Sequence, residues 1–149
     1  NYEQATRIPI IIKAPGVTKE NTYCDQTVET VDLYPTLTAL ANLDRKSPTH
    51  NLDGKNLTPL LNDPNYPVKD HIYHSFIRQG NLGEAIRDKR YRMIRWTNLK
   101  DRENIVYELY DYKKDPKERV NIANKNKGID KKLLKKLNTY PPAKGLISM

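Results

Sequence analysis

The segment Glu108–Ala123, with the sequence ELYDYKKDPKERVNIA, constrains the fold more than any other part of this chain. Its start belongs to a stretch of alternating polar and apolar residues, as in a strand with one buried face. Asp115 precedes Pro116, and this pair predicts a turn, because proline fixes φ and an aspartate side chain bonds to nearby backbone. Glu118 is expected early in a helical turn, where its charge suits the helix dipole. The segment therefore predicts a strand, a turn and a helix in succession.

The second half of the chain predicts a small antiparallel sheet of about four strands followed by a helix. The candidate strands are residues 71–77, 83–87, 90–96 and 105–112. The final helix has an apolar face and an opposite face of lysines, so we expect it to cover one side of the sheet. Its apolar face consists of Ile129, Leu133, Leu134 and Leu137. Two prolines and a glycine then end regular structure in a tail over residues 141–149.

The first half predicts part of a larger sheet. Ile8–Ile12 is a continuous apolar run, which is typical of a strand buried on both faces in a parallel α/β sheet. Residues 32–42 predict a helix with Asp32 as N-cap and Pro35 in the first turn. Its expected apolar stripe is Leu33, Leu37, Leu40 and Ala41. Few other segments could complete such a sheet, so we expect most of its strands to lie outside this chain.

These elements define an α/β fold class with four regions. Residues 1–45 form the end of an α/β domain, and residues 46–70 form connecting loops with a short helix over 57–61, capped by Asn56 and with Pro59 in its first turn. Residues 71–140 form the antiparallel subdomain, and 141–149 the tail.

Composition predicts a thin core and a basic surface. The 149 residues allow one domain or part of one, with 37% hydrophobic and 30% charged residues. No apolar run approaches the roughly 20 residues of a membrane span. The formal net charge of +8 is concentrated in the second half. It suits a polyanionic partner, or it only keeps the surface solvated, and the sequence leaves both open.

The residues offer no convincing catalytic or metal centre. Cys24 is the single cysteine, which excludes an intrachain disulfide and makes a Cys-based zinc site improbable. His71 and His74 are three residues apart, so on a strand they point to opposite faces and make no joint metal site. Asp111, Asp115 and Glu118 lack the glycine of a calcium loop.

Nucleic-acid binding by the basic stretch 87–96 is not favoured either. Strand alternation divides its basic and apolar residues between both faces, so neither face is a clean basic platform. One face holds Arg92, Ile94 and Trp96, and the other holds Tyr91, Met93 and Arg95.

Several sequence segments, taken in their order along the chain, resemble the C-terminal part of the sulfatase family of the alkaline-phosphatase-like superfamily. They are Tyr2–Ile12, Asp32–Leu37, Asp53–Leu61, Ala85–Arg92 and Glu108–Ala123. The pattern is most similar to that of iduronate-2-sulfatase-like members. The resemblance implies a sulfuric ester hydrolase acting on a sulfated glycan such as a glycosaminoglycan, in a periplasmic, secreted or lysosomal setting.

The same resemblance implies a calcium ion and a formylglycine nucleophile in the full-length enzyme. The formylglycine motif, Cys/Ser-x-Pro-x-Arg, is absent here, because Cys24 is followed by Asp-Gln-Thr. We therefore expect no catalytic residue and no metal ligand in this segment, and we expect its partner to be the N-terminal catalytic portion of the same protein.

Arg87 and His74 are the candidates for contacting an anionic sugar, because an arginine fork matches carboxylate or sulfate groups. The alternative for Arg87 is a structural pair with a carboxylate such as Asp111. Arg7 is expected to be a structural ion-pair partner. Two other functions stay open: a related phosphodiesterase or phosphonate hydrolase with the same closing domain, and a stand-alone basic module that binds polyanions.

Overall fold

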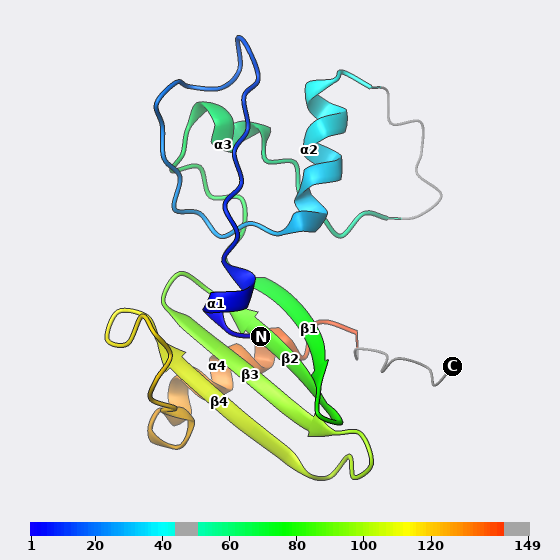
Figure 1. Ribbon diagram of the computed structural model, residues 1–149, viewed down its shortest axis with the longest axis vertical. Coiled ribbons are helices and arrows are strands. Elements are labelled where there is room, and N and C mark those ends of the chain that lie inside the picture. The colour runs from blue at the N-terminus through cyan, green and yellow to red at the C-terminus, as the bar shows by residue number, and fades with distance from the viewer. Residues whose placement is uncertain (44–50, 142–149) are drawn as a thin grey trace. The chain divides into compact units, whose positions relative to one another are not determined.

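The computed structural model describes residues 1–43 and 51–141, so the predicted tail from residue 142 onward lies outside the described residues. The chain divides into two compact units (Figure 1). Residues 1–8 and the chain from His71 onward form the sheet unit, and residues 9–70 form the helical unit. The assignment of residues 1–45 to a larger domain stays a prediction.

The sheet unit contains the four-stranded antiparallel sheet that the sequence predicts. Its strands are β1 (Ile72–Arg78), β2 (Asn81–Arg87), β3 (Tyr91–Asn98) and β4 (Ile105–Asp111), in the spatial order β1-β2-β3-β4. Gln79 and Gly80 both have positive φ, of 49° and 73°, between the paired residues Arg78 and Asn81. Such a two-residue turn matches the twist of the strands that it joins. The sheet is therefore a meander built from local hairpins.

Helix α4 (Lys127–Leu137) covers one face of the sheet, as predicted, and lies behind it in Figure 1. Leu133 and Leu137 are buried against Ile86, Met93 and Leu109. The predicted partners Ile129 and Leu134 pack at the border of this cluster. The helical period of the leucines and the strand period of the sheet thus bring the two apolar faces together.

The predicted helical turn at Glu118 is not formed. Glu118 has a φ of 53° and lies in a loop before the 3₁₀ helix η2 (Ala123–Lys125). Asp115 does make the predicted turn, since its Oδ2 accepts hydrogen bonds from the backbone N–H of Arg119 and Val120. The cause is tertiary, because the Glu118 carboxylate pairs with the buried guanidinium of Arg92 on β3.

Residues 1–8 lie on the face of the sheet opposite α4, and they include the short helix α1 (Glu3–Thr6). The ring of Tyr2 meets that of Tyr110 edge-on at 6.2 Å, over the buried side chains of Ala85 and Ile94. Gly83 allows this close approach, because a Cβ at this position would lie 2.5 Å from the ring of Trp96 and 2.0 Å from Nδ2 of Asn1. The start of the chain therefore completes a second, smaller core on the face of the sheet opposite α4.

The helical unit contains η1 (Thr30–Asp32), α2 (Leu33–Leu40) and α3 (Thr58–Asn62). Asp32 is fully buried, and its carboxylate accepts from the N–H groups of Glu29 and Lys55 at 2.8 and 2.7 Å. It also pairs with Nζ of Lys69 at 2.6 Å. Asp32 occupies the predicted N-cap position of α2, but its side chain makes no cap hydrogen bond there. Its carboxylate instead closes the preceding turn and anchors two distant segments.

The predicted short helix is present one residue later, as α3, with Pro59 in its first turn. Oδ1 of Asn56 accepts from the N–H of Thr58, two residues on.

Two apolar features of the first half differ from the prediction. No strand forms over Ile8–Ile12, where Ile8 is 55% and Ile11 94% exposed. On α2 the buried residues are Pro35, Thr36 and Thr38, whereas Leu37 of the expected stripe is 60% exposed. A strand needs neighbouring strands and an apolar stripe needs a covering surface, and no residue that the structure describes supplies either.

The contact between α4 and the sheet can be tested with Leu133→Ala. Leu133 is 0% exposed, so the truncation should lower the free energy of unfolding by about 2–5 kcal/mol. Lys132→Ala changes the adjacent, exposed residue and should shift it by less than about 0.5 kcal/mol. Denaturant titration of both variants measures the difference, and equal losses would contradict the packing described here.

Candidate functional site

A buried arginine, Arg92 on β3, organises the face of the sheet on which α1 lies. Its side chain is 0% exposed. Its Nη2 lies 2.8 Å from Oε2 of Glu3, and its Nε lies 3.0 Å from Oε1 of Glu118. A buried charge is tolerated only when it is paired and its hydrogen-bonding groups are satisfied. The two carboxylates come from opposite ends of the sequence and meet at this one cation.

Neutral groups complete the hydrogen bonding of Arg92. It donates to the carbonyl oxygen of Asn1, to Oγ1 of Thr6 and to the hydroxyl of Tyr112. The Tyr112 hydroxyl in turn donates to Oε1 of Glu118 at 2.6 Å. Burial raises the pKa of Tyr112, which keeps this hydroxyl protonated as a donor. We call this set the Arg92 cluster: Asn1, Glu3, Thr6, Arg92, Tyr112 and Glu118.

The predicted site residue Arg87 lies beside this cluster. It is opposite Arg92 in the register of β2 and β3, so two guanidinium groups are neighbours. Glu3 offsets their repulsion, since its carboxylate lies 3.2 Å from Nε of Arg87 as well as 2.8 Å from Arg92. The ring of Tyr112 lies under both guanidinium groups, 4.6 Å from that of Arg87 and 5.8 Å from that of Arg92. Arg87 is thus held by structural contacts.

The structural partner of Arg87 is Glu3, and the suggested pair with Asp111 is wrong. Asp111 forms a two-point pair with Arg90, at 3.0 Å from Nε and 2.8 Å from Nη2. Alternation along the strands explains the difference. Arg87 is in register with Arg92, which is paired with Tyr110, so Asp111 next to Tyr110 points to the other face.

His74, the second predicted site residue, lies on the same face as Arg87. Its Nε2 is buried and has no hydrogen-bond partner among the described residues. Burial, with a further contribution from the nearby Arg92 charge, lowers the pKa of His74 to about 4. The imidazole is therefore neutral near pH 7 and is not a cationic ligand for a sulfate group. His71 points to the opposite face, as predicted, where its ring meets that of Tyr140 at 5.8 Å.

Arg7 does not form the expected ion pair with any residue that the structure describes. Its side chain is exposed at a shallow cleft beside α1, which Glu3, Gln4, Pro116, Lys117 and Glu118 also line. Glu3 and Glu118 are already paired with arginines, so this cleft gathers no free catalytic carboxylates.

The residues present do not fit the calcium ion or the formylglycine of the resemblance. Within residues 1–43 and 51–141, no group of three His, Cys, Asp or Glu side chains is placed to hold a metal ion. Cys24 is an exposed loop thiol whose Sγ donates to the carbonyl oxygen of Pro64 at 3.3 Å. The same ranges contain no helix long and apolar enough to cross a membrane.

Sequence reasoning selected Arg87 and His74, which the structure places on one face, but it missed the Arg92 cluster. A signal was available: Glu3 and Glu118 both lie in the segments that carry the family resemblance, as does Arg92. Glu3 lies 89 positions from Arg92 and 115 positions from Glu118 in the sequence, and no local pattern reveals such contacts.

Comparisons with known proteins agree with this fold. Residues 1–141 match the family described as N-sulphoglucosamine sulphohydrolase, C-terminal. The meander sheet of four strands, with its terminal helix and the N-terminal segment packed on it, is thus the C-terminal part of an alkaline-phosphatase-like sulfatase fold. The chain belongs to this sulfatase C-terminal family.

Two curated relatives illustrate the similarity. An ulvan-active sulfatase from Formosa agariphila is 28% identical over 93% of this chain and 34% of its own length. A Δ4,5-hexuronate-2-O-sulfatase from Bacteroides thetaiotaomicron is 33% identical over 82% of this chain and 25% of its own length. The chain therefore spans about a third or less of these relatives. The hexuronate enzyme matches the iduronate-2-sulfatase-like expectation only loosely.

Two solved structures show the same fold. The candidate sulfatase yidJ from Bacteroides fragilis has a TM-score of 0.68 at 20% identity, over 84% of this chain and 27% of that one. A phosphonate monoester hydrolase of Agrobacterium radiobacter has a TM-score of 0.54 at 25% identity, over 72% of this chain and 24% of that one.

The Arg92 cluster can be tested with Arg92→Met. The change leaves the carboxylates of Glu3 and Glu118 without their buried cation, so we expect a loss of about 3–5 kcal/mol in the free energy of unfolding. Arg90→Met is the matched control, because the side chain of Arg90 is 44% exposed and solvent screens its pair with Asp111, so the loss of stability should be much smaller. Similar losses in the two variants would contradict the central role of Arg92.

The environment of His74 predicts a pH dependence of stability. The pKa of His74 is lower in the folded protein, about 4, than its ordinary value of 6.5, so the unfolded chain binds the proton more tightly. Stability from this group is present above pH 6.5 and is lost as the pH falls toward 4. Between pH 7 and pH 5 the loss should be on the order of 2 kcal/mol.

Urea titrations of the protein and of His74→Gln at both pH values measure this loss. The variant should lose less stability than the parent between the two pH values, while His71→Gln should keep the parent's dependence. An unchanged dependence in His74→Gln would contradict the assignment.

Proposed function

We propose that this chain is the C-terminal portion of a sulfatase that hydrolyses sulfate esters of a sulfated glycan. The observation that carries the proposal is the family match over residues 1–141, in a chain that spans a third or less of its sulfatase relatives. Those relatives are an ulvan-active sulfatase and a Δ4,5-hexuronate-2-O-sulfatase, and the second name specifies a sulfated uronate sugar. A sulfated, uronate-containing glycan is the substrate class that follows.

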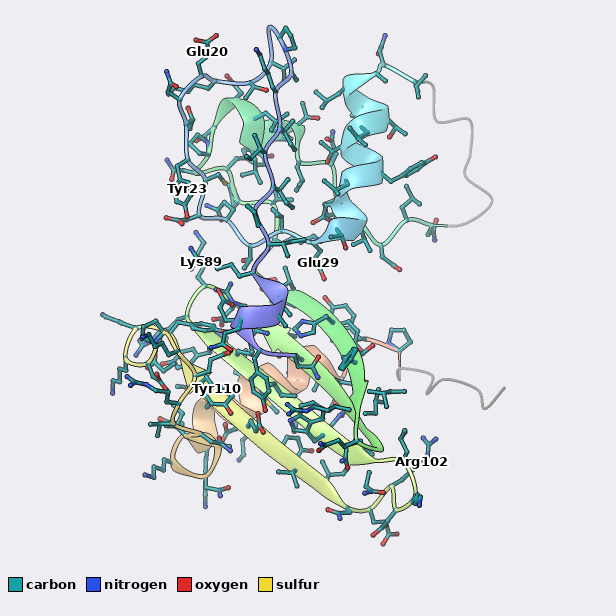
Figure 2. All side chains as sticks on the ribbon, in the orientation of Figure 1. Glu20, Tyr23, Glu29, Lys89, Arg102 and Tyr110 are labelled. Carbon is teal, nitrogen blue, oxygen red and sulfur yellow. The ribbon has the colours of Figure 1, made fainter. Side chains whose placement is uncertain are left out.

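In this proposal the segment is structural, and the nucleophile, the calcium ligands and the acid-base residues belong to the N-terminal portion of the same protein. The helical unit supports such a partner, because large apolar side chains lie exposed on it. Ile11 is 94%, Tyr23 73%, Tyr34 62% and Leu37 60% exposed, and Figure 2 labels Tyr23 in a loop of this unit. An exposed apolar surface of this kind favours packing against another protein part.

Arg87 and His74 are proposed to border the substrate cleft from the small sheet. Arg87 keeps donors beyond its pair with Glu3, since a guanidinium group carries five N–H donors. His74, being neutral, would contribute a hydrogen bond and not a charge. Because Arg87 pairs with Glu3, its first role in this proposal is to position the N-terminal segment, and contact with substrate is its second.

A phosphonate or phosphodiester hydrolase is the second candidate. It is favoured by the shared fold of the Agrobacterium radiobacter phosphonate monoester hydrolase. Because the closing domain is common to both, the substrate preference of the complete protein separates the two functions.

The test compares the complete protein with the 149-residue chain on three small substrates: 4-nitrophenyl sulfate, bis(4-nitrophenyl) phosphate and a 4-nitrophenyl phosphonate. We expect the complete protein to prefer the sulfate ester, and the isolated chain to turn over none of them and to bind no calcium tightly. Sulfate-ester turnover by the isolated chain would overturn the structural role. Preference of the complete protein for the phosphonate would favour the second candidate.

Arg87→Ala in the complete protein tests the substrate contact. A raised KM for a sulfated oligosaccharide, with an unchanged melting temperature, supports contact. A lowered melting temperature with unchanged KM assigns Arg87 to structure alone. Arg90→Ala is the control. Arg90 lies in the turn that follows Arg87, and it pairs with Asp111, whose side chain points to the other face of the sheet.

A further inference from the structure

A row of lysines follows the outer side of the chain's last helix. Residues 113–136 hold ten lysines and arginines against three carboxylates, which accounts for most of the net charge of +8. The exposed members on η2 and α4 define the lysine face: Lys125, Lys127, Lys131, Lys132 and Lys135. The opposite side of α4 carries Leu133 and Leu137, which are buried against the sheet. The lysine face therefore points away from the core.

The three nearby carboxylates do not neutralise this face. Glu118 is turned inward and paired with Arg92. Asp115 accepts two backbone hydrogen bonds within its own turn. Asp130 is partly buried in the first turn of α4. The lysine-face residues form no ion pair with any residue of the described ranges, so their positive charges are uncompensated.

Helix stability does not explain this arrangement. Lys127, Lys131 and Lys135 follow one another at a spacing of four residues, which brings like charges together on one side of the helix. Such pairs destabilise a helix, whereas glutamate and lysine at the same spacing would stabilise it and keep it equally soluble. The lysines extend over about 12 Å between Lys127 and Lys135, at 1.5 Å per residue. This is the length of a short oligosaccharide and not of a single small anion.

We propose that the lysine face binds the anionic polysaccharide chain whose sulfate esters the enzyme hydrolyses, away from the reacting sulfate. The proposal rests on the proposed function. Lysine suits this ligand, because a mobile ammonium group pairs with sulfate or carboxylate as a point charge without demanding one geometry. The face carries no aromatic side chain for stacking bases and no exposed large apolar side chain for entering a membrane.

The lysine face adds affinity for long substrates and leaves the chemistry unchanged. A polymer that touches both the active site and this surface binds more tightly than a small ester that reaches the active site alone. The expected signature is therefore a change in KM that depends on substrate length.

The experiment uses the complete protein with Lys131→Gln, Lys132→Gln and Lys135→Gln combined. The matched control combines Lys89→Gln, Lys100→Gln and Arg102→Gln, which removes the same charge from the strand turns of the same unit. Figure 2 labels Lys89 and Arg102 at these turns. Lys131→Arg, Lys132→Arg and Lys135→Arg combined keeps the charge. All six positions in the two sets are exposed, so folding should be preserved, and melting temperatures verify this.

Heparin is the binding probe, titrated at several salt concentrations, and kinetics compare 4-nitrophenyl sulfate with a sulfated polysaccharide that the parent protein turns over. We expect the lysine-to-glutamine variant to lose roughly tenfold in heparin affinity, a loss that three exposed ion pairs can account for. Its salt dependence should become shallower, its KM for the polymer should rise, and its KM for 4-nitrophenyl sulfate should not change. The arginine variant should retain affinity.

Equal losses in the control variant, or an unchanged heparin affinity in the lysine-to-glutamine variant, would overturn the proposal. So would a lysine-dependent affinity for double-stranded DNA that exceeds that for heparin. Turnover of 4-nitrophenyl sulfate by the parent protein reports on the proposed function separately, so each idea can fail without the other.

Discussion

The buried guanidinium of Arg92 is the constraint on which the sheet unit depends. A fully buried cation is stable only beside carboxylates, and Arg92 has two, Glu3 from the start of the chain and Glu118 from beyond the sheet. Each carboxylate brings its backbone with it: Glu3 fixes α1 on the sheet, and Glu118 fixes the loop after β4. The N–H of Glu3 also donates to Oε2 of Glu118 at 2.8 Å, so the two anchors are tied to each other.

This constraint also determines the local chemistry of the candidate site residues. Arg87 is the neighbour of Arg92 in the sheet register and shares Glu3 with it, so the carboxylate of Glu3 already offsets part of the charge of Arg87. His74 is half-buried on the same face, with its Nε2 inaccessible to solvent, and its lowered pKa, in part an effect of the same arginine, keeps it neutral near pH 7. The face that holds the N-terminal segment is thus organised by paired charges, whereas the α4 face is organised by apolar packing and leaves its lysines to solvent.

The sequence predicted the elements whose signal is local. The four strands and α4 follow from periodicity, and the turn at Asp115 follows from a side chain that bonds to backbone a few residues away. The failures are non-local. The side chain of Asp32, at the N-cap position of α2, bonds to Lys55 and Lys69 and not to the helix backbone. Arg87 pairs with Glu3 and not with Asp111. The apolar run Ile8–Ile12 has strand character, but no described segment pairs with it.

The sequence by itself determined the sheet, the helix that covers it and the sulfatase resemblance, because hydrophobic period, turn chemistry and ordered motifs are read along the chain. Only the tertiary structure decided which carboxylates pair with Arg92, why the helical turn predicted at Glu118 does not form, and which lysines remain without a counter-charge. These outcomes depend on pairing between residues far apart in sequence, and such pairing is selected by burial: a charge taken out of water must find its partner wherever the fold places it.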